Sequence, residues 1–482
     1  MTQDHAAFYS ALRSRDPRFD GVFFVGVTST GIYCRPICTA KPVKAANCRF
    51  FTSAEAAERE NFRPCLRCRP ELAPGNAPVD DARRIASLLV HRIDEGMLDD
   101  PSDGRWMERV AKQFGWSSRQ IRRIVQRELG VSPMELLQTR RLLLAKQLLT
   151  ETALPISQVA YASGYSSLRR FNDAFSGRYR MPPSRFRRNV TADSVAPSET
   201  FTLQLGYRAP FAWELLLDFL RARQTAGVEH VTEESYIRTV SLGECRGWIQ
   251  VRNDAEHRCL RVTLTHALTP VLPALLGRLR NLFDLSARPD VIGAALEQHD
   301  VLRESVARRA GLRVPGAFDG FELAMRAILG QQVSVKAATT LSGRVAEKFG
   351  ATANTPHPEL TRFAPTAERV AGLREKDLSA LGVLATRAQS IIALAKSMEA
   401  GMALEPGADP ATTMERLVVI PGIGPWTASY IAMRALRWTD AFPAGDVAIR
   451  KRLGGPSAGE ADRMSQAWRP WRSYATMHLW AG

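Results

Sequence analysis

The chain has 482 residues, which is enough for three or four domains with separate hydrophobic cores. Its 65 Lys and Arg residues outnumber its 49 Asp and Glu residues, and the formal net charge of +16 favours nucleic acid as a polyanionic partner. The N-terminus lacks a secretory signal pattern, and no apolar run approaches the length of a membrane span. We therefore expect a multidomain protein of the cytoplasm with no membrane partner.

Five of the seven cysteines fall within the first seventy residues. Cys34 and Cys38 form one closely spaced pair, and Cys65 and Cys68 form a second pair after 26 intervening residues. In a reducing compartment such clustering indicates metal or thiol chemistry rather than disulfides. The two pairs predict a tetrahedral site that holds one zinc ion through four thiolates, whereas Cys48 lies outside both pairs and is assigned to packing.

The residues around both pairs, TSTGIYCRPIC and FRPCLRCRPE, resemble the N-terminal domain of the Ada adaptive-response family from Gly31 through Pro70. This resemblance implies a small zinc-bound α/β domain over residues 1–75 in which one zinc thiolate is also a reagent. By the same resemblance, Cys34 accepts a methyl group from a methylphosphotriester in the DNA backbone. Methylation removes a negative charge beside DNA, so affinity for the phosphates should rise. On spacing alone, a purely structural zinc knuckle is the alternative.

A Pro- and Gly-containing linker over about residues 71–82 leads into a helical region, residues 82–190, that contains an internal repeat. The segment Val110–Ser118 recurs as Val159–Ser167, 49 positions later. In each copy we expect the Ala to pack between helices, the Gly to permit a tight turn and the Ser pair to cap the next helix. Each copy therefore predicts a helix-turn-helix unit.

The second helix of each unit exposes polar and basic side chains and is a candidate recognition helix for the major groove. The predicted DNA contacts are Arg119, Arg122, Arg123, Arg169 and Arg170. One such pattern alone is often a packing motif. Two copies joined by a long helix resemble the AraC-type DNA-binding domain, which implies an all-α domain that binds promoter sites as an activator, with RNA polymerase as a further partner.

A second linker, Thr191–Glu199, is followed by alternating strand patterns and two amphipathic helical patterns. The strands are expected at residues 201–205, 237–242, 245–252 and 259–266, and the helices at residues 212–223 and 270–282. Residues 198–285 are therefore predicted to form a small α+β domain. It resembles, more loosely than the other regions, the N-terminal scaffold domain of AlkA-type glycosylases.

The remaining region, residues 289–482, is predicted to be all-α. Within it, Gly422 and Gly424 separate two apolar helical patterns, so they can form a hairpin whose N–H groups suit a phosphate oxygen; Thr427 is a further predicted DNA contact at this helix start. Asp446 lies in a loop just before a short helical run, where it could also be a simple N-cap. Taken alone, the hairpin could be a packing loop.

Together these features resemble the helix-hairpin-helix DNA glycosylases, with the AlkA-type 3-methyladenine DNA glycosylases as the best match. The resemblance implies that Asp446 is the catalytic carboxylate and that Trp426, Tyr430 and Trp480 line the base pocket. Their electron-rich faces suit an alkylated base that carries positive charge. Gln332 stands where the family pattern has an apolar wedge that fills the gap left by the extruded nucleotide, although a Gln can also fill a hole and hydrogen-bond the orphaned base.

An alkylated cationic base is already a good leaving group, so one carboxylate is enough to stabilise the oxocarbenium ion or to activate water. Glycosylases that also cut the strand use a Lys where this motif has Trp426, so we predict a monofunctional enzyme. No Cys follows Cys259, so no iron–sulfur cluster is expected, nor is an organic cofactor. We expect a monomer that binds double-stranded DNA.

Two hypotheses from different classes remain. In the first, an alkylation sensor, a transcription factor and a repair glycosylase share one chain. In the second, the protein is a DNA-binding regulator whose glycosylase half is inactive and serves only as a DNA clamp. The presence of Asp446 with an intact aromatic trio favours the first hypothesis.

Overall fold

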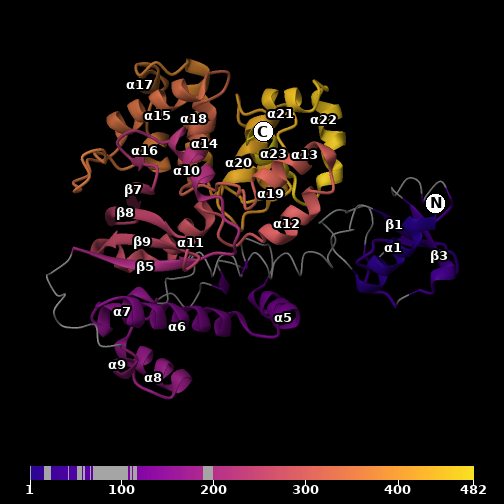
Figure 1. Ribbon diagram of the computed structural model, residues 1–482, viewed down its shortest axis with the longest axis horizontal. Helices are drawn as coiled ribbons and strands as arrows, with labels where there is room; N and C mark the ends of the chain where they lie inside the picture. The colour runs from indigo at the N-terminus through magenta and orange to yellow at the C-terminus, as the bar shows by residue number, and fades with distance from the viewer. Residues whose placement is uncertain are drawn as a thin grey trace. The chain divides into compact units, whose positions relative to one another are not determined.

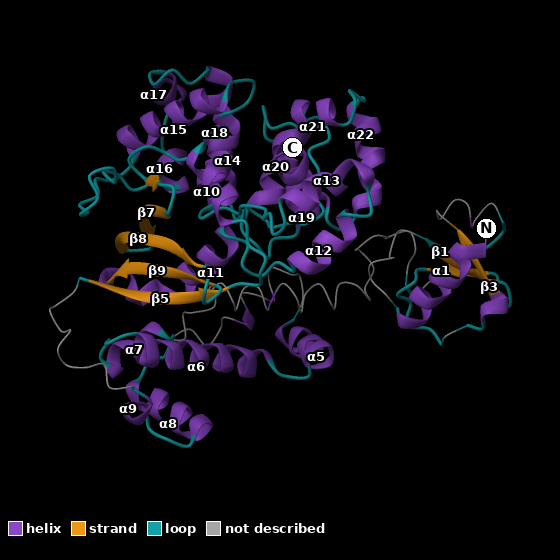
Figure 2. Cartoon of the chain, viewed as in Figure 1, coloured by secondary structure: helices purple, strands orange, loops and turns teal. Residues whose placement is uncertain are grey.

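The computed structural model describes residues 2–15, 23–41, 43–51, 57, 60–65, 67–68, 89, 107–108, 111, 117–187 and 199–481. These residues divide into two compact units, the first of which ends at Leu136, while the second runs from Leu137 to the last helix. The architecture is multidomain and mainly helical, with two small sheets, as the sequence predicts (Figures 1 and 2). None of the described helices is long and apolar enough to cross a membrane.

The N-terminal part of the first unit is a helix and a four-stranded sheet. The sheet has the order β3-β1-β2-β4, and the elements are α1 (Thr2–Ser14), β1 (Phe24–Val27), β2 (Ile32–Cys34), β3 (Cys48–Phe51) and β4 (Arg63–Pro64). Strand β1 runs antiparallel to β2 and β3, whereas β2 and β4 are parallel, with Tyr33 opposite Pro64. Because parallel strands leave a sheet in the same direction, Cys34 and Cys65 come together at one end.

Helix α5 (Ser118–Leu129), also in the first unit, follows the first predicted helix-turn-helix turn. Ser117 caps the helix: its side chain accepts the N–H of Gln120 while the Gln120 side chain accepts the N–H of Ser117. The helix ends at Gly130 with φ of 75°, a left-handed conformation that glycine adopts without strain. The turn itself, residues 112–116, lies outside the described residues.

The second repeat forms a complete helix-turn-helix in the structure. The elements are α6 (Pro133–Glu151), which carries the chain into the second unit, α7 (Ile156–Ala162), α8 (Leu168–Tyr179) and α9 (Pro183–Phe186). Gly164 makes the turn with φ of 85°, and the Ser167 side chain caps α8 by accepting the N–H of Arg170. Phe171 and Phe175, one helical turn apart on α8, are fully buried and fix this helix against its neighbours.

The next region has the predicted α+β character: it is a five-stranded antiparallel sheet with helices, and it includes one short strand, β6, that the sequence did not predict. The order is β5-β9-β8-β7-β6, with β5 (Thr200–Gly206), β6 (Glu229–Val231), β7 (Ser235–Leu242), β8 (Cys245–Asp254) and β9 (Cys259–Thr265). It is accompanied by α10 (Trp213–Arg221), η5 (His266–Val271) and α11 (Leu272–Leu282). Strand β5 alternates buried Phe201, Leu203 and Leu205 with more exposed residues, so one face packs on the core.

The C-terminal region is helical and has its own core. Its elements are α12 (Pro289–Leu296), α13 (Asp300–Arg308), α14 (Gly320–Leu329), α15 (Val335–Phe349), α16 (Ala367–Ala371), α17 (Glu375–Ser379), α18 (Ala385–Glu399), α19 (Pro410–Val419), α20 (Pro425–Arg434), α21 (Val447–Arg452), α22 (Ala458–Ser465), η6 (Gln466–Trp468) and α23 (Arg472–Ala481). Helix α14 is buried along most of its length and packs against α15, α18 and α20 (Figure 1). Because α14 contacts α20, this packing holds the α19–α20 hairpin in place.

Candidate functional site

The first site is a cluster of four cysteine sulfurs at the end of the N-terminal sheet. The Sγ atoms of Cys34, Cys38, Cys65 and Cys68 all lie within 4.8 Å of one another, and all four residues are buried. Zn–S bonds of about 2.3 Å in a tetrahedron would place the sulfurs about 3.8 Å apart. The donor set therefore fits one zinc ion, and these four residues would hold it.

The sulfurs of this cluster differ in their hydrogen bonds. The N–H of Arg35 donates to Sγ of Cys68 at 3.4 Å, and the N–H of Ala40 donates to the sulfur of Cys38. Hydrogen bonding with Cys34 lowers the pKa of Cys38, while hydrogen bonding with Cys38 raises the pKa of Cys34. Within the described residues, no backbone N–H donates to Cys34. Its sulfur is therefore less stabilised by dipoles than those of Cys38 and Cys68.

The fifth cysteine of this domain stands apart from the cluster. The Cys48 thiol donates to the carbonyl oxygen of Lys44 at 3.4 Å, and burial raises its pKa. This placement agrees with the assignment of Cys48 to packing.

The predicted DNA-contacting arginines lie on the helices that follow the two turns. Arg119, Arg122 and Arg123 are exposed on α5, and Arg169 and Arg170 are exposed on α8. Ile121, Ile124 and Val125 of α5 are buried, as are Phe171 and Phe175 of α8, so the basic face of each helix remains available to a ligand. Each helix therefore has the surface chemistry that a recognition helix requires.

The α19–α20 hairpin forms as predicted. Gly422 has φ of 84°, and a Cβ atom built there would lie 2.3 Å from Oγ of Ser390, so this position requires glycine. Gly424 is the N-cap of α20 without a side-chain cap, and a Cβ atom there would meet nothing within 4 Å. Because the first N–H groups of a helix lack intrahelical partners, the exposed start of α20 can bind an anion.

The side chain of Thr427, a predicted DNA contact, forms a hydrogen bond within the protein. Its side chain is buried, and its Oγ1 accepts a hydrogen bond from Nε2 of Gln331 at 3.0 Å. The same Nε2 donates to the carbonyl oxygen of Gly422 at 2.8 Å, so Gln331 joins the turn after α14 to the hairpin. Because its side chain is buried, Thr427 can offer its backbone N–H to an anion, but not its hydroxyl group.

Asp446 lies at the centre of the second site, as the N-cap of α21. Its Oδ1 accepts the N–H of Ile449 at 3.0 Å and the indole N–H of Trp480 at 3.2 Å. Its Oδ2 accepts the indole N–H of Trp426 at 3.0 Å. The carboxylate is thus a helix cap and is also held by two tryptophans from α20 and α23. Among the described residues, no Lys, Arg or His forms an ion pair with it.

The three predicted pocket aromatics are brought together around this carboxylate. The rings of Trp426 and Tyr430 stack with centroids 5.5 Å apart and an interplanar angle of 9°, and the ring of Trp480 lies 6.2 Å from that of Tyr430. All three side chains are partly exposed. Aromatic faces beside an uncompensated carboxylate favour a flat cationic ligand.

Four family models match successive parts of the chain. They are the metal binding domain of Ada (residues 7–71), a helix-turn-helix domain (residues 110–189), the AlkA N-terminal domain (residues 202–319) and the HhH-GPD superfamily of base excision DNA repair proteins (residues 325–472). The "Probable bifunctional transcriptional activator/DNA repair enzyme AlkA" of Mycobacterium tuberculosis is 38% identical over 489 residues, which cover 100% of this chain and 97% of the relative. The chain belongs to this Ada/AlkA fusion family.

Other relatives match a smaller share of this Ada/AlkA fusion. DNA-3-methyladenine glycosylase 2 of Escherichia coli is 37% identical over 277 residues, which cover 57% of this chain and 95% of the relative. The solved 3-methyladenine DNA glycosylase of Archaeoglobus fulgidus superposes with a TM-score of 0.51 at 19% identity, and covers 57% of this chain and 96% of its own; it shows a shared fold. The chain is therefore an Ada-type regulator with a zinc-binding domain, joined to an AlkA-type DNA glycosylase.

The structure of the fusion also shows site residues that sequence reasoning missed. Arg434 is buried, donates to the Tyr430 hydroxyl at 2.6 Å, and is anchored by the carbonyl oxygens of Pro315 and Gly316 at 2.8 and 2.9 Å. Burial raises the pKa of Tyr430, but the nearby positive charges, of which Arg434 is the strongest, outweigh this effect and leave that pKa lowered. The spacing of four residues between Tyr430 and Arg434 was the available signal.

Gln332 is exposed in the turn after α14 and has φ of 55°, which is uncommon for a residue with a side chain. The turn is held on both sides, because Arg387 donates to the carbonyl oxygen of Gln331 while the Gln331 side chain bonds to the hairpin. The structure therefore presents Gln332 on a fixed turn beside the hairpin.

Proposed function

We propose that the C-terminal half hydrolyses the N-glycosidic bond of N-alkylated bases of the 3-methyladenine type, without cutting the strand. The observation that carries this proposal is the carboxylate of Asp446, held by the indole N–H groups of Trp426 and Trp480 at the edge of the aromatic cluster. Because it has no cationic partner among the described residues, its negative charge is free to act on a positively charged reacting centre. Relatives named as 3-methyladenine glycosylases support the substrate class.

The reaction begins with an extruded nucleotide whose cationic base stacks on Trp426, Tyr430 or Trp480. As the bond from base to sugar breaks, its electron pair leaves with the base, and positive charge develops on the sugar. Asp446 stabilises that charge or accepts a proton from the attacking water. The products are a free base and an abasic site, and neither step requires an organic cofactor.

The hairpin and the neighbouring turn would hold the DNA during this reaction. The N–H groups at the start of α20 bind a backbone phosphate, and Gly424 allows the phosphate to approach closely. Gln332, exposed on its fixed turn, fills the space of the extruded nucleotide and hydrogen-bonds to the orphaned base.

In the N-terminal domain we propose a stoichiometric methyl transfer to Cys34 from a methylphosphotriester. When bound, zinc keeps the thiols deprotonated. The Cys34 sulfur attacks the methyl carbon, the new S–C bond forms as the C–O bond breaks, and the electron pair leaves with the oxygen to give an anionic phosphodiester. Hydrogen bonds from Arg35 and Ala40 make the sulfurs of Cys68 and Cys38 poorer nucleophiles, and the resemblance to the Ada family selects Cys34 rather than Cys65.

We propose that methylation then strengthens promoter binding by α5 and α8, because one negative charge near the phosphates is lost. The protein would act there as a monomeric activator that recruits RNA polymerase. Arg119→Ala and Arg169→Ala should each weaken binding to the specific site more than binding to unrelated duplexes. Equal loss on all sequences would mean that these arginines contact only phosphates.

Two measurements on the full-length protein test these proposals. Chromatography of bases released from alkylated duplex DNA should show free 3-methyladenine and an intact strand. Mass spectrometry after incubation with methylphosphotriester DNA should find one methyl group on the peptide that contains Cys34. If no base is released, the rival reading of an inactive DNA clamp is favoured.

A further inference from the structure

Strand β5 lies at one edge of the five-stranded sheet, where backbone groups on the outer side have no partner strand. The structure satisfies these groups at Gln204 with two side chains of helix α6. The N–H of Gln204 donates to Oε2 of Glu151 at 2.9 Å, and its carbonyl oxygen accepts from Nε2 of Gln147 at 2.7 Å. Gln147 also donates to the Glu151 carboxylate at 3.0 Å, which closes the arrangement.

Gln147 and Glu151 are separated by one helical turn, so both side chains leave α6 on the same face. They reproduce the donor and acceptor that a neighbouring strand would offer to Gln204. We call these three residues the edge clasp. It joins a helix of the regulator to a strand of the glycosylase half.

Apolar packing continues the contact. Buried residues of α6 and of β5 belong to one hydrophobic cluster, which also includes the buried phenylalanines of α8 and the leucines of α11. Helix α7 packs against η5. The cluster contains Leu142, Ala145, Leu148, Leu149, Phe201, Leu203 and Leu205. The second helix-turn-helix unit and the sheet therefore share a core, and burial of that core stabilises their association.

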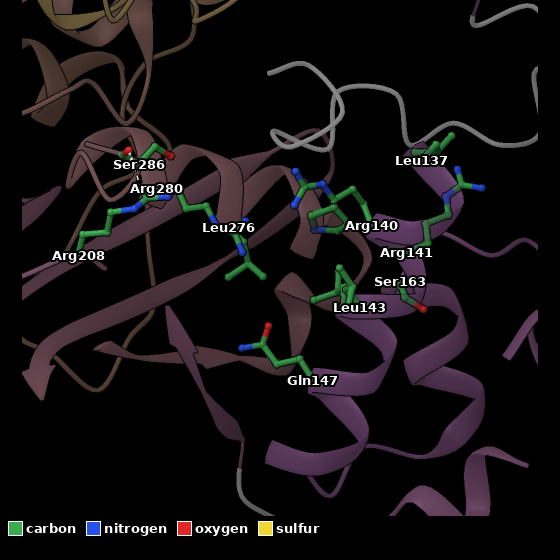
Figure 3. Close-up of a pocket in the computed structure, with 12 residues that line it drawn as sticks. Leu137, Arg140, Arg141, Leu143, Gln147, Ser163, Arg208, Leu276, Arg280 and Ser286 are labelled. Carbon is green, nitrogen blue, oxygen red and sulfur yellow. Dashed lines mark hydrogen bonds between the residues drawn. The ribbon is translucent and has the colours of Figure 1, made fainter. Parts of the chain in front are cut away.

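Other residues of α6 border a cavity of about 480 Å³, whose opposite wall is formed by residues on and near α11 and whose lining includes Gln147 of the edge clasp (Figure 3). Leu137, Arg140 and Leu144 line it from α6, and Arg208, Leu276 and Arg280 line it from the other side. Polar attachment of α6 to β5 is therefore provided at the C-terminal end of the helix, by the edge clasp.

We propose that the edge clasp and the shared core make the second helix-turn-helix unit and the glycosylase half one rigid body, so that the DNA-reading face of α8 cannot move independently of the glycosylase. DNA bound by α8 would therefore have a fixed position and orientation relative to the sheet, whereas a flexible linker would leave both variable. This inference depends only on the contacts between α6 and β5, and it holds whether or not the glycosylase half is catalytic.

A nicked form of the full-length protein tests the proposal. A protease site placed within residues 191–198 allows the chain to be cut between the two parts, and gel filtration then reports whether the fragments stay together. We expect the fragments of the otherwise unchanged protein to elute as one species. Immediate separation would overturn the proposal.

A paired substitution isolates the edge clasp. Gln147→Ala with Glu151→Ala should weaken association of the fragments by about tenfold or more, because two hydrogen bonds to the strand edge are lost. The matched control is Lys146→Ala with Thr150→Ala, which changes exposed residues one position earlier on the same helix and should leave association unchanged. Equal weakening in both pairs would contradict the proposal.

Hydrogen exchange provides a readout that does not depend on cutting. The amide of Gln204 should exchange slowly in the intact protein and faster with Glu151→Ala, while the amides of β9 keep their protection. If Gln204 exchanges at the same rate in both proteins, the clasp is not formed in solution.

Discussion

The indole N–H of Trp426 donates to the carboxylate of Asp446 at 3.0 Å, although the two residues belong to different helices. The hydrogen bond links the start of α20, which the hairpin places, to the start of α21. The face of the same indole stacks on Tyr430, so one side chain contributes both a ring to the aromatic cluster and a donor to the carboxylate. The position of the aromatic rings and the position of the negative charge are therefore fixed together.

Asp446→Asn should reduce base excision by about a hundredfold or more, because it removes negative charge that is needed chiefly in the transition state. The fold should be kept, since Asn is as good an N-cap as Asp. Release of 3-methyladenine in single-turnover assays gives the rate, and the melting temperature reports the fold. Asp300→Asn changes an exposed carboxylate and is the control. Unchanged excision by the Asp446→Asn protein would remove this residue from catalysis.

Trp480→Phe should lower the excision rate by about tenfold, because it removes a hydrogen bond to a charged group but keeps an aromatic ring in the pocket. Trp426→Phe should have a similar effect. Trp471→Phe provides the comparison, since that ring packs on Tyr474 and makes no hydrogen bond to Asp446. The effect should appear in the rate at saturating DNA. A change confined to DNA affinity would show that the indoles bind substrate without orienting the carboxylate.

Gly424→Ala and Gly422→Ala should separate DNA binding from folding. At Gly424 the added methyl group meets open space, so stability should be unchanged while binding weakens for damaged and undamaged duplexes alike. At Gly422 the methyl group would collide with Ser390 at a positive φ, so the melting temperature should fall. Binding by fluorescence anisotropy and melting by calorimetry test the pair. Normal DNA binding by the Gly424→Ala protein would exclude a phosphate contact there.

Cys65→Ser should abolish stoichiometric zinc binding, because one of four clustered sulfurs is lost. Cys48→Ser should leave the zinc content at one ion per chain, since its thiol bonds to Lys44 outside the cluster. Elemental analysis of both purified proteins measures the metal directly. Full zinc occupancy in the Cys65→Ser protein would contradict the four-thiolate assignment.

His478 should make the C-terminal region sensitive to acid. Burial, together with the charge of Arg309, lowers its pKa from 6.5 to about 4. Between pH 4 and pH 6.5 the unfolded chain binds more protons than the native one. The free energy of unfolding is therefore highest above pH 6.5 and decreases as the pH falls towards 4. The loss amounts to about 3 kcal/mol.

The measurement is the melting temperature followed by tryptophan fluorescence at pH 7 and pH 4.5. His478→Asn should reduce the difference between the two values, whereas His257→Asn, a change at an exposed imidazole, should not. An equal difference in all three proteins would assign the acid sensitivity to other groups.

Much of this fold could be predicted because its patterns are local. Alternating apolar and polar residues predicted strands at β8 and β9, and paired cysteine spacings predicted the sulfur cluster. The edge clasp was not predictable in this way, because Gln147 and Glu151 read as ordinary solvent-exposed helix residues until the position of β5 is known. Thr427 likewise looks available at a helix start, but the contact with Gln331 that buries it depends on a segment almost a hundred residues away.

Asp446 closes helix α21 with one oxygen while both oxygens bond to tryptophans. A Glu at this position would keep the charge but carry it one methylene farther from the helix start, so it would leave α21 uncapped and shift the carboxylate away from the indoles. An Asn would keep the cap and lose the charge. The helix cap requires a short side chain, and the negative charge requires a carboxylate. Asp meets both requirements, whereas Glu and Asn each meet only one.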